Sequence, residues 1–90
     1  MDLYKAIEEM RRLSSEGKSF SFCFMSYSYE RRKSDGVVTI NKARLRKQSR
    51  KDTNRFADYM LNFIDLHTME YGMCWQPLLL SFNDEEIELK

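Results

Sequence analysis

The residues on which metal and nucleotide sites depend are scarce in this chain. Its 90 residues include one His, three Gly and one Pro. Because His67 is the single histidine, a histidine-based metal cluster cannot form within one copy of the chain. The glycines are isolated at positions 17, 36 and 72, so no glycine-rich phosphate loop is present. Low glycine and proline content also argues against a disordered or low-complexity chain.

Cysteines and long apolar runs are equally limited. Cys23 and Cys74 are far apart and form no CxxC motif. We expect both to be small buried apolar residues of a reduced protein, with a disulfide between them as the alternative. The longest apolar stretch, residues 78–80, is far too short to span a bilayer. Charged residues within the first ten positions interrupt any secretory signal, so a cytoplasmic, non-membrane protein is expected.

Charge is abundant, and it is sorted along the chain. The formal net charge is only +1. Residues 31–55 nevertheless hold ten Lys and Arg against two acidic residues, a net charge of +8, whereas residues 56–90 carry a net charge of −6. A folded domain with this pattern presents a basic surface and an acidic surface. We therefore expect a polyanion, an acidic partner or a second copy of the chain to bind it.

The spacing of apolar residues predicts secondary structure in the first half of the chain. Residues 3–15 have the three- and four-residue spacing of an amphipathic helix, with Asp2 as a candidate N-cap and Gly17 as its stop. Residues 19–29 and 37–46 alternate like strands joined by a polar loop. Both strands change parity along their length, which indicates a bulge near residues 24–26 and a long, bent hairpin.

The second half is predicted to add a helix and two strands. Five apolar residues, at 56, 59, 60, 63 and 64, and His67 have the spacing of a helix over 53–67. Residues 74–82 are predicted to form an apolar strand that contains Pro77. A turn at 83–84 precedes a last short strand at 87–89. The expected fold is a single α+β domain over residues 1–90 in the order α-β-β-α-β-β. Its two helices lie on one face of a mostly antiparallel sheet.

No arrangement of residues indicates catalysis. Asp65, His67 and Glu70 are close in sequence, but on the predicted helix positions 65 and 67 point apart, which disfavours a metal site. The acidic residues 84–88 are typical of a solvated tail, and no nucleophile has a recognisable context. We therefore expect a non-enzymatic protein without cofactor or metal.

The basic run is the strongest candidate for a contact site. On one strand face, Arg44 and Arg46 repel each other unless an anion lies between them. Cations at the positive end of the predicted second helix are disfavoured by roughly 0.3–1 kcal/mol each, and the free N–H groups there suit an anion. A solvated surface, a protein or self contact, and nucleic acid are the three interpretations. The predicted contact residues are Lys42, Arg44, Arg46, Lys47, Arg50, Lys51 and Arg55.

Three aromatic residues are candidates for the same interface. Tyr27 and Tyr29 precede a cluster of cations and could stack on bases, although cross-strand packing within the hairpin explains them equally well. Trp75 has the opposite parity to Leu78, Leu80 and Phe82. If those three face the core, Trp75 points outward as an interface anchor.

Four segments resemble short uncharacterised proteins of bacteriophage and prophage gene clusters. The segments are DLYKAI (2–7), GKSFSF (17–22), ARLRK (43–47) and CWQPLLLSFN (74–83), so the resemblance extends over most of the chain. It implies a virion component such as a head-closure, neck, tail or decoration subunit, and no catalytic residues. The primary expectation is thus an interaction or structural subunit that binds a protein partner or itself, in the cytoplasm or in a phage particle. A small nucleic-acid-binding module is the alternative, and a small enzyme or a motif-poor toxin–antitoxin partner is a third possibility.

Overall fold

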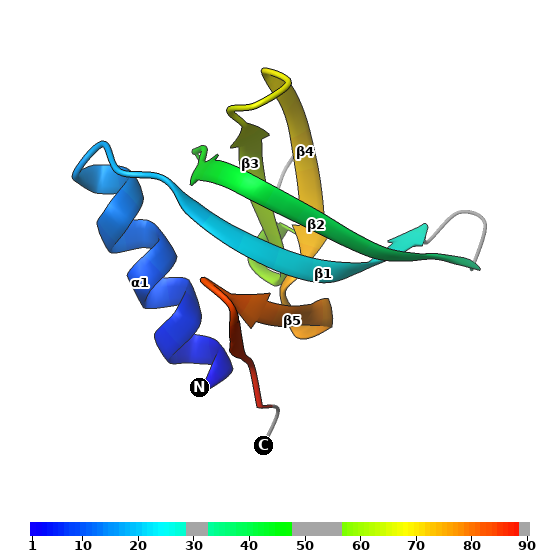
Figure 1. Ribbon diagram of the computed structural model, residues 1–90. Helices are drawn as coiled ribbons and strands as arrows, with labels where there is room; N and C mark the ends of the chain where they lie inside the picture. The colour runs from blue at the N-terminus through cyan, green and yellow to red at the C-terminus, as the bar shows by residue number, and fades with distance from the viewer. Residues whose placement is uncertain (29–32, 48–56, 89–90) are drawn as a thin grey trace.

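An α-helix packed against a curved, six-stranded antiparallel sheet makes up the part of the chain that the computed structural model describes, residues 1–28, 33–47 and 57–88 (Figure 1). The strands follow the order β4-β3-β2-β1-β5-β6 across the sheet. The elements in chain order are α1 (Leu3–Ser15), β1 (Phe20–Ser28), β2 (Lys33–Leu45), the 3-10 turn η1 (Ala57–Tyr59), β3 (Met60–Asp65), β4 (Glu70–Trp75), the 3-10 turn η2 (Gln76–Leu78), β5 (Leu79–Phe82) and β6 (Glu85–Glu86).

The predicted α-β-β-α-β-β order with two helices is wrong. Residues 57–59 form only a 3-10 turn, and residues 60–65 form β3, which pairs with β2 and β4 instead of winding into a helix. The predicted strand over 74–82 is also two strands, because η2, with Pro77 in its first turn, separates β4 from β5. The last pairing lies at Glu85–Glu86, earlier than expected, and follows a turn in which Asn83 and Asp84 both have positive φ.

Helix α1 has the predicted limits. The Oδ1 atom of Asp2 accepts a hydrogen bond from the Tyr4 amide at 2.7 Å, which satisfies one of the free N–H groups of the first turn. Gly17 follows the helix with φ 74°, the left-handed conformation that glycine adopts without a steric cost. The apolar stripe of the helix, Ala6, Ile7 and Met10, is buried against the sheet.

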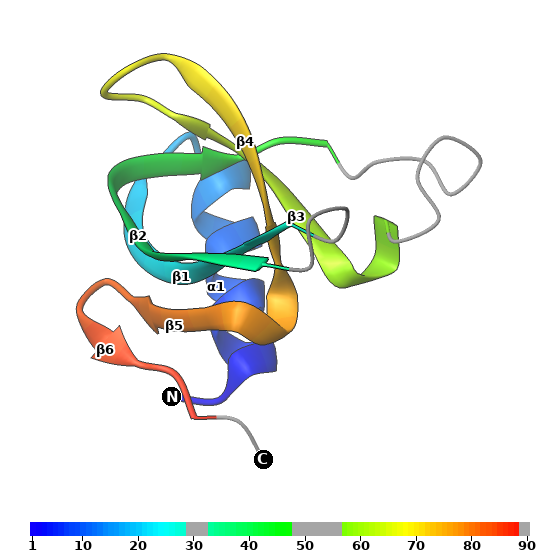
Figure 2. The ribbon, with the colours of Figure 1, turned by 90° about the vertical axis from the view of Figure 1, so that its right-hand side faces the viewer.

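The sheet curls so strongly that strands separated in the sheet order touch. Strand β2 bends along its length (Figure 2), and the β1–β2 pairing shifts register between Phe20 and Phe22 and again between Ser26 and Tyr27. The ring of Phe22 on β1 therefore lies 5.1 Å from that of Phe63 on β3, although β2 runs between the two strands. The bent hairpin expected from the parity changes is thus present. Its register shift between Ser26 and Tyr27 lies next to the bulge predicted near residues 24–26.

Inward-facing side chains of every strand except β6 meet in one core. Its centre is aromatic, with five ring–ring contacts at centroid distances of 5.1–5.8 Å. Such contacts contribute about 0.5–1.5 kcal/mol each beyond the burial of apolar area. The buried residues from the strands are Phe20, Phe22, Phe24, Ile40, Ala43, Leu61, Phe63, Cys74, Leu79 and Phe82.

Both cysteines have free thiols. Cys74 is buried in the core, and burial raises the pKa of its thiol to about 12, so the neutral form persists well above physiological pH. Cys23 is half-buried on β1, with its Sγ atom 3.3 Å from the Thr39 hydroxyl. No helix among the described residues is long and apolar enough to cross a bilayer.

The last turn of α1 completes the hydrogen bonding of β2. The β1–β2 pairing ends where Phe20 meets Ala43, so the Leu45 amide lies beyond the end of β1. The Ser14 hydroxyl accepts a hydrogen bond from that amide at 2.9 Å and donates one to the Met10 carbonyl at 2.7 Å. The Ser14 hydroxyl thus supplies the hydrogen-bond acceptor that a longer β1 would have offered to Leu45.

Replacing Ser14 by Ala is expected to lower the free energy of unfolding by about 1–3 kcal/mol, because the partly buried Leu45 amide loses its acceptor. Ser15→Ala is the matched control, since the Ser15 hydroxyl is exposed and bonds only to the Arg12 carbonyl of its own helix. That control should change stability by no more than about 0.5 kcal/mol. Urea unfolding of both variants measures the difference, and equal effects would mean that the Ser14–Leu45 bond contributes nothing.

Candidate interaction surface

Alternation along β2, β3 and β4 divides their side chains between the core and an outward face. The register aligns Arg44 on β2 with Ile64 on β3, and Ile64 with Tyr71 on β4. The neighbouring residues Ala43, Leu61 and Phe63 point into the core on the other face. The outward face of these three strands is therefore opposite the core face against which α1 packs.

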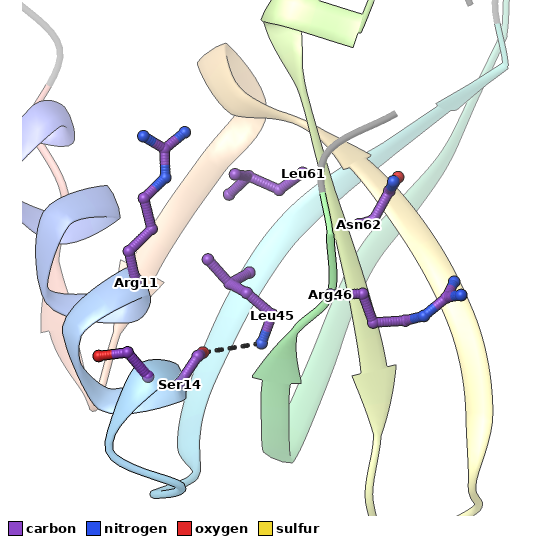
Figure 3. Close-up of a pocket in the computed structure, with 7 residues that line it drawn as sticks. Arg11, Ser14, Leu45, Arg46, Leu61 and Asn62 are labelled. Atoms are coloured by element: carbon purple, nitrogen blue, oxygen red, sulfur yellow. Dashed lines mark hydrogen bonds between the residues drawn. The ribbon is translucent and has the colours of Figure 1, made fainter. Parts of the chain in front are cut away.

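An arginine and a tyrosine form the centre of this outward face. The guanidinium carbon of Arg46 lies 3.9 Å from the centroid of the Tyr71 ring, a cation–π contact across β3. The Arg46 side chain points away from α1 and toward β4 (Figure 3). Tyr71 is 69% exposed and Met73, two residues later on the same face, is 46% exposed. Large apolar side chains therefore remain in solvent at the margin of the sheet.

The backbone of β4 also points outward at these two residues. In an antiparallel sheet each residue directs its N–H and C=O groups to one side, and successive residues alternate sides. Asn62 on β3 bonds to β2, because its carbonyl accepts from the Arg46 amide at 2.8 Å. The flanking residues of β3, Leu61 and Phe63, therefore bond to β4.

Their register partners on β4 are Cys74 and Gly72. The alternation then directs the backbone groups of Tyr71 and Met73 away from β3, into the open margin of the sheet. We call these two residues, with Met69 and Arg46, the β4 surface. It combines exposed apolar side chains with main-chain donors and acceptors to which no strand within residues 1–28, 33–47 and 57–88 is bonded.

The predicted basic residues that the structure describes have different roles. Lys42, Arg46 and Lys47 are exposed. Arg44 is half-buried, and its Nη2 atom donates to the Gly17 carbonyl at 3.0 Å, which ties the end of α1 to β2. Arg50, Lys51 and Arg55 lie outside the described residues. The argument from a helix N-terminus does not hold, since the expected helix is absent over residues 60–65.

The predicted aromatic contacts separate in the same way. Tyr27, at the register shift of β1, is 39% exposed and lies on the β1–β2 hairpin, away from the β4 surface. Trp75 ends β4 and is half-buried. Tyr29 lies outside the described residues.

The sequence interpretation missed Tyr71, Met73 and Met69. It assigned residues 68–72 to a connection, because the predicted helix extended to residue 67. The alternation of Glu70, Tyr71, Gly72 and Met73 is a strand pattern that could have revealed β4. No sequence pattern, however, marks which strand of a sheet lies at its margin.

The acidic residues of the β5–β6 turn lie at the opposite margin. Asp84, Glu85 and Glu86 are exposed at the β5–β6 turn, while the β3–β4 hairpin is at the other end of the sheet (Figures 1 and 2). No ion pair joins Lys42, Arg46 or Lys47 to an acidic residue in the described part of the chain. These three residues are thus at the other margin from the exposed cations, whereas Asp65 and Glu70 pair with each other in the β3–β4 hairpin, so acidic residues occur at both margins.

A cavity of about 520 Å³ opens between α1 and the ends of β2 and β3. Its two arginines do not converge, because Arg46 points toward β4 whereas Arg11 extends from α1 on the other side (Figure 3). Ser14 is already engaged with Leu45. The cavity therefore offers hydrogen-bond donors without a carboxylate, thiol or imidazole. Its lining residues are Arg11, Ser14, Ser15, Leu45, Arg46, Leu61 and Asn62.

No group of three or more potential metal ligands occurs within residues 1–28, 33–47 and 57–88. Comparisons with protein-family models, with curated proteins and with solved structures gave no match. The geometry of the β4 surface is accordingly the basis for a function.

Proposed function

We propose that this chain is a non-enzymatic interaction subunit that binds an extended protein segment along the β4 surface. One observation carries the proposal: Tyr71 and Met73 direct their backbone groups away from β3, and their side chains are exposed on the outward face of the same strand. Strand addition to such an edge derives affinity from main-chain hydrogen bonds and specificity from alternate side chains.

The composition of the surface supports this function. Tyrosine, methionine and arginine are enriched in protein interfaces, and Tyr71, Met73 and Arg46 supply all three. Natural sheets usually protect an open edge with lysine, proline or a bulge. β4 has none of these, and Glu70 is its single charged residue. An unprotected apolar edge of this kind is typical of a docking strand.

A structural role in a phage particle, as the sequence resemblance implies, stays a prediction. Strand addition is compatible with it, because subunits of a particle need repeated contacts between small domains. The experiment below tests the docking mode, which does not depend on the biological source of the partner.

The test is a selection of random twelve-residue peptides on the immobilised protein. We expect extended peptides with alternating apolar residues to bind the natural chain and to lose at least about tenfold in affinity on Tyr71→Lys, because a charge on the edge opposes strand addition. Val37→Lys is the matched control, since Val37 is 59% exposed on β2 and the substitution adds the same charge. Equal losses in both variants, or no selected peptides, would refute docking at β4.

Single-stranded nucleic acid is a second candidate, favoured by a specific observation. Lys42, Arg46 and Lys47 are exposed without a described acidic partner, and the exposed Tyr71 ring lies against the Arg46 guanidinium. Cations together with stacking aromatics are typical of single-strand binding. The acidic residues at 84–86, which would repel phosphate, are at the far margin.

If single strands bind there through about three phosphate contacts, affinity should fall about 20-fold between 50 and 200 mM salt. Arg46→Ala should weaken binding and reduce the salt dependence, whereas Lys5→Ala on the exposed face of α1 should not. Fluorescence anisotropy with labelled DNA and RNA measures both. An absence of binding at 50 mM salt would eliminate this candidate.

A further inference from the structure

We propose that the segment bound at the β4 surface is β4 of a second copy, paired antiparallel about a twofold axis at Gly72. The proposal rests on the proposed function and specifies its partner. It concerns a symmetric dimer, in which the same patch of each copy contacts the other.

The backbone pattern of β4 suits this arrangement. With Gly72 opposite Gly72 of the second copy, Tyr71 of each copy lies opposite Met73 of the other. Because Tyr71 and Met73 direct their N–H and C=O groups outward, both pairs are of the hydrogen-bonded type and together form four main-chain bonds. The pair at the axis is of the close type, with Cα atoms about 4.5 Å apart. Glycine at that position leaves the close approach unobstructed.

The side chains of the edge are complementary to themselves. In this register the thioether of Met73 meets the ring of Tyr71 from the other copy, a contact that stabilises by about 0.3–1.5 kcal/mol. Residues 71–73 carry no charge, so two copies bring no like charges into opposition within the paired strands. The cation–π contact with Arg46 holds each Tyr71 ring above its own sheet.

The opposite margin of the sheet is not available for head-to-tail pairing. The Met1 amino group donates to the Glu86 carbonyl at 3.0 Å, and the Glu88 amide donates to the Met1 carbonyl at 2.7 Å. Asp2 and Glu88 form a bridge beside these bonds. The start of the chain thus covers the β6 side, whereas no strand of the described residues pairs with the outer edge of β4. Pairing of β4 with itself closes at two copies, and neither a ring nor a filament follows.

The charge near the interface predicts an unusual salt response. Each copy contributes an Arg46 beside the twofold axis, so the two basic surfaces repel weakly across it. Salt screens this repulsion, since the Debye length falls from about 14 Å at 50 mM to about 4 Å at 500 mM. Dimerisation should therefore strengthen at high salt, the opposite of nucleic-acid binding.

Mixed disulfide formation tests the register. Two variants, Tyr71→Cys and Met73→Cys, are prepared separately in a Cys23→Ser background and then mixed under mild oxidation. The proposed register places each new thiol opposite the other, with Cα atoms about 5.5 Å apart, within the range for a disulfide. The native Cys74 is buried and protonated, so it does not compete.

We expect the mixture to give at least about ten times more covalent dimer than either variant alone. Disulfides in the unmixed samples at the same level would contradict the register, and the absence of a covalent dimer in the mixture would overturn the proposal. The natural chain provides a second measurement, since the amides of Tyr71 and Met73 should exchange more slowly with deuterium as protein concentration rises. Concentration-independent exchange would also overturn the dimer, whereas binding of the selected peptides would still support the proposed function.

Discussion

Replacing Phe63 by Ala is expected to lower the free energy of unfolding by about 3–5 kcal/mol. Phe63 is 5% exposed, and its ring lies 5.1 Å from Phe22 and 5.8 Å from Phe24, so it joins the β3–β4 hairpin to β1. The substitution removes the ring that lies between these strands and leaves a cavity. A domain of this size is stable by roughly 5–13 kcal/mol, so this one change removes a large part of the total.

Urea unfolding followed by circular dichroism measures the loss. Tyr71→Ala is the matched control, because it removes an aromatic ring from the same hairpin but from its exposed face. It should cost no more than about 1 kcal/mol, the value of an exposed cation–π contact. Equal losses in the two variants would show that the ring contacts of Phe63 are not what holds the curled sheet together.

Gly72→Ala should destabilise the protein by about 1–3 kcal/mol, and the cost should depend on Phe63. A Cβ atom at position 72 would lie 2.5 Å from Cζ of Phe63. The ring cannot move aside cheaply, because Phe22 and Phe24 pack against it. The expected cost is that of overpacking a core.

A double-mutant cycle isolates this contact. In the Phe63→Ala background the space above position 72 is empty, so Gly72→Ala should cost little or even stabilise by restricting the unfolded chain. The coupling free energy should be about 1–3 kcal/mol. Additive effects of the two substitutions would contradict the close contact between the ring and the glycine.

Local signals sufficed for the first half of the fold. The helix over 3–15 was predictable because its stripe, its Asp2 cap and its Gly17 stop all lie within a few residues of one another. The first hairpin was predictable for the same reason, since the parity changes of its strands reflect the register shifts of β1 against β2. Each of these features is determined by neighbouring residues.

The second helix was predicted wrongly because the apolar spacing of this segment fits both the 3.6-residue period of a helix and the two-residue period of a strand. Residues 59, 60, 63 and 64 fit a helix, yet Leu61 and Phe63 also alternate with Asn62 and Ile64, as they do in β3. Pairing with β2 on one side and β4 on the other favours the strand. Those partners are a property of the whole fold, which a single window of sequence does not contain.

The candidate site was predictable only in part. Of the cations counted over residues 31–55, Lys42, Arg46 and Lys47 are exposed, but Arg44 is half-buried and bonds to the Gly17 carbonyl. The apolar part of the surface was missed, because the exposure of Tyr71 depends on β4 lying at the sheet margin. Charge can be counted from the sequence, whereas the position of an edge strand cannot.

The strand order also bears on how quickly the chain folds. Four of the five pairings that build the sheet join strands that follow one another along the chain, and local hairpins form within about 1–10 μs. The pairing of β1 with β5 brings together residues as far apart as Ser21 and Asn83, 62 positions along the chain. The entropy of closing so long a loop is lost before its contacts form, so we expect β5 to dock last. Substitutions in β5 should then accelerate unfolding and leave the rate of folding nearly unchanged.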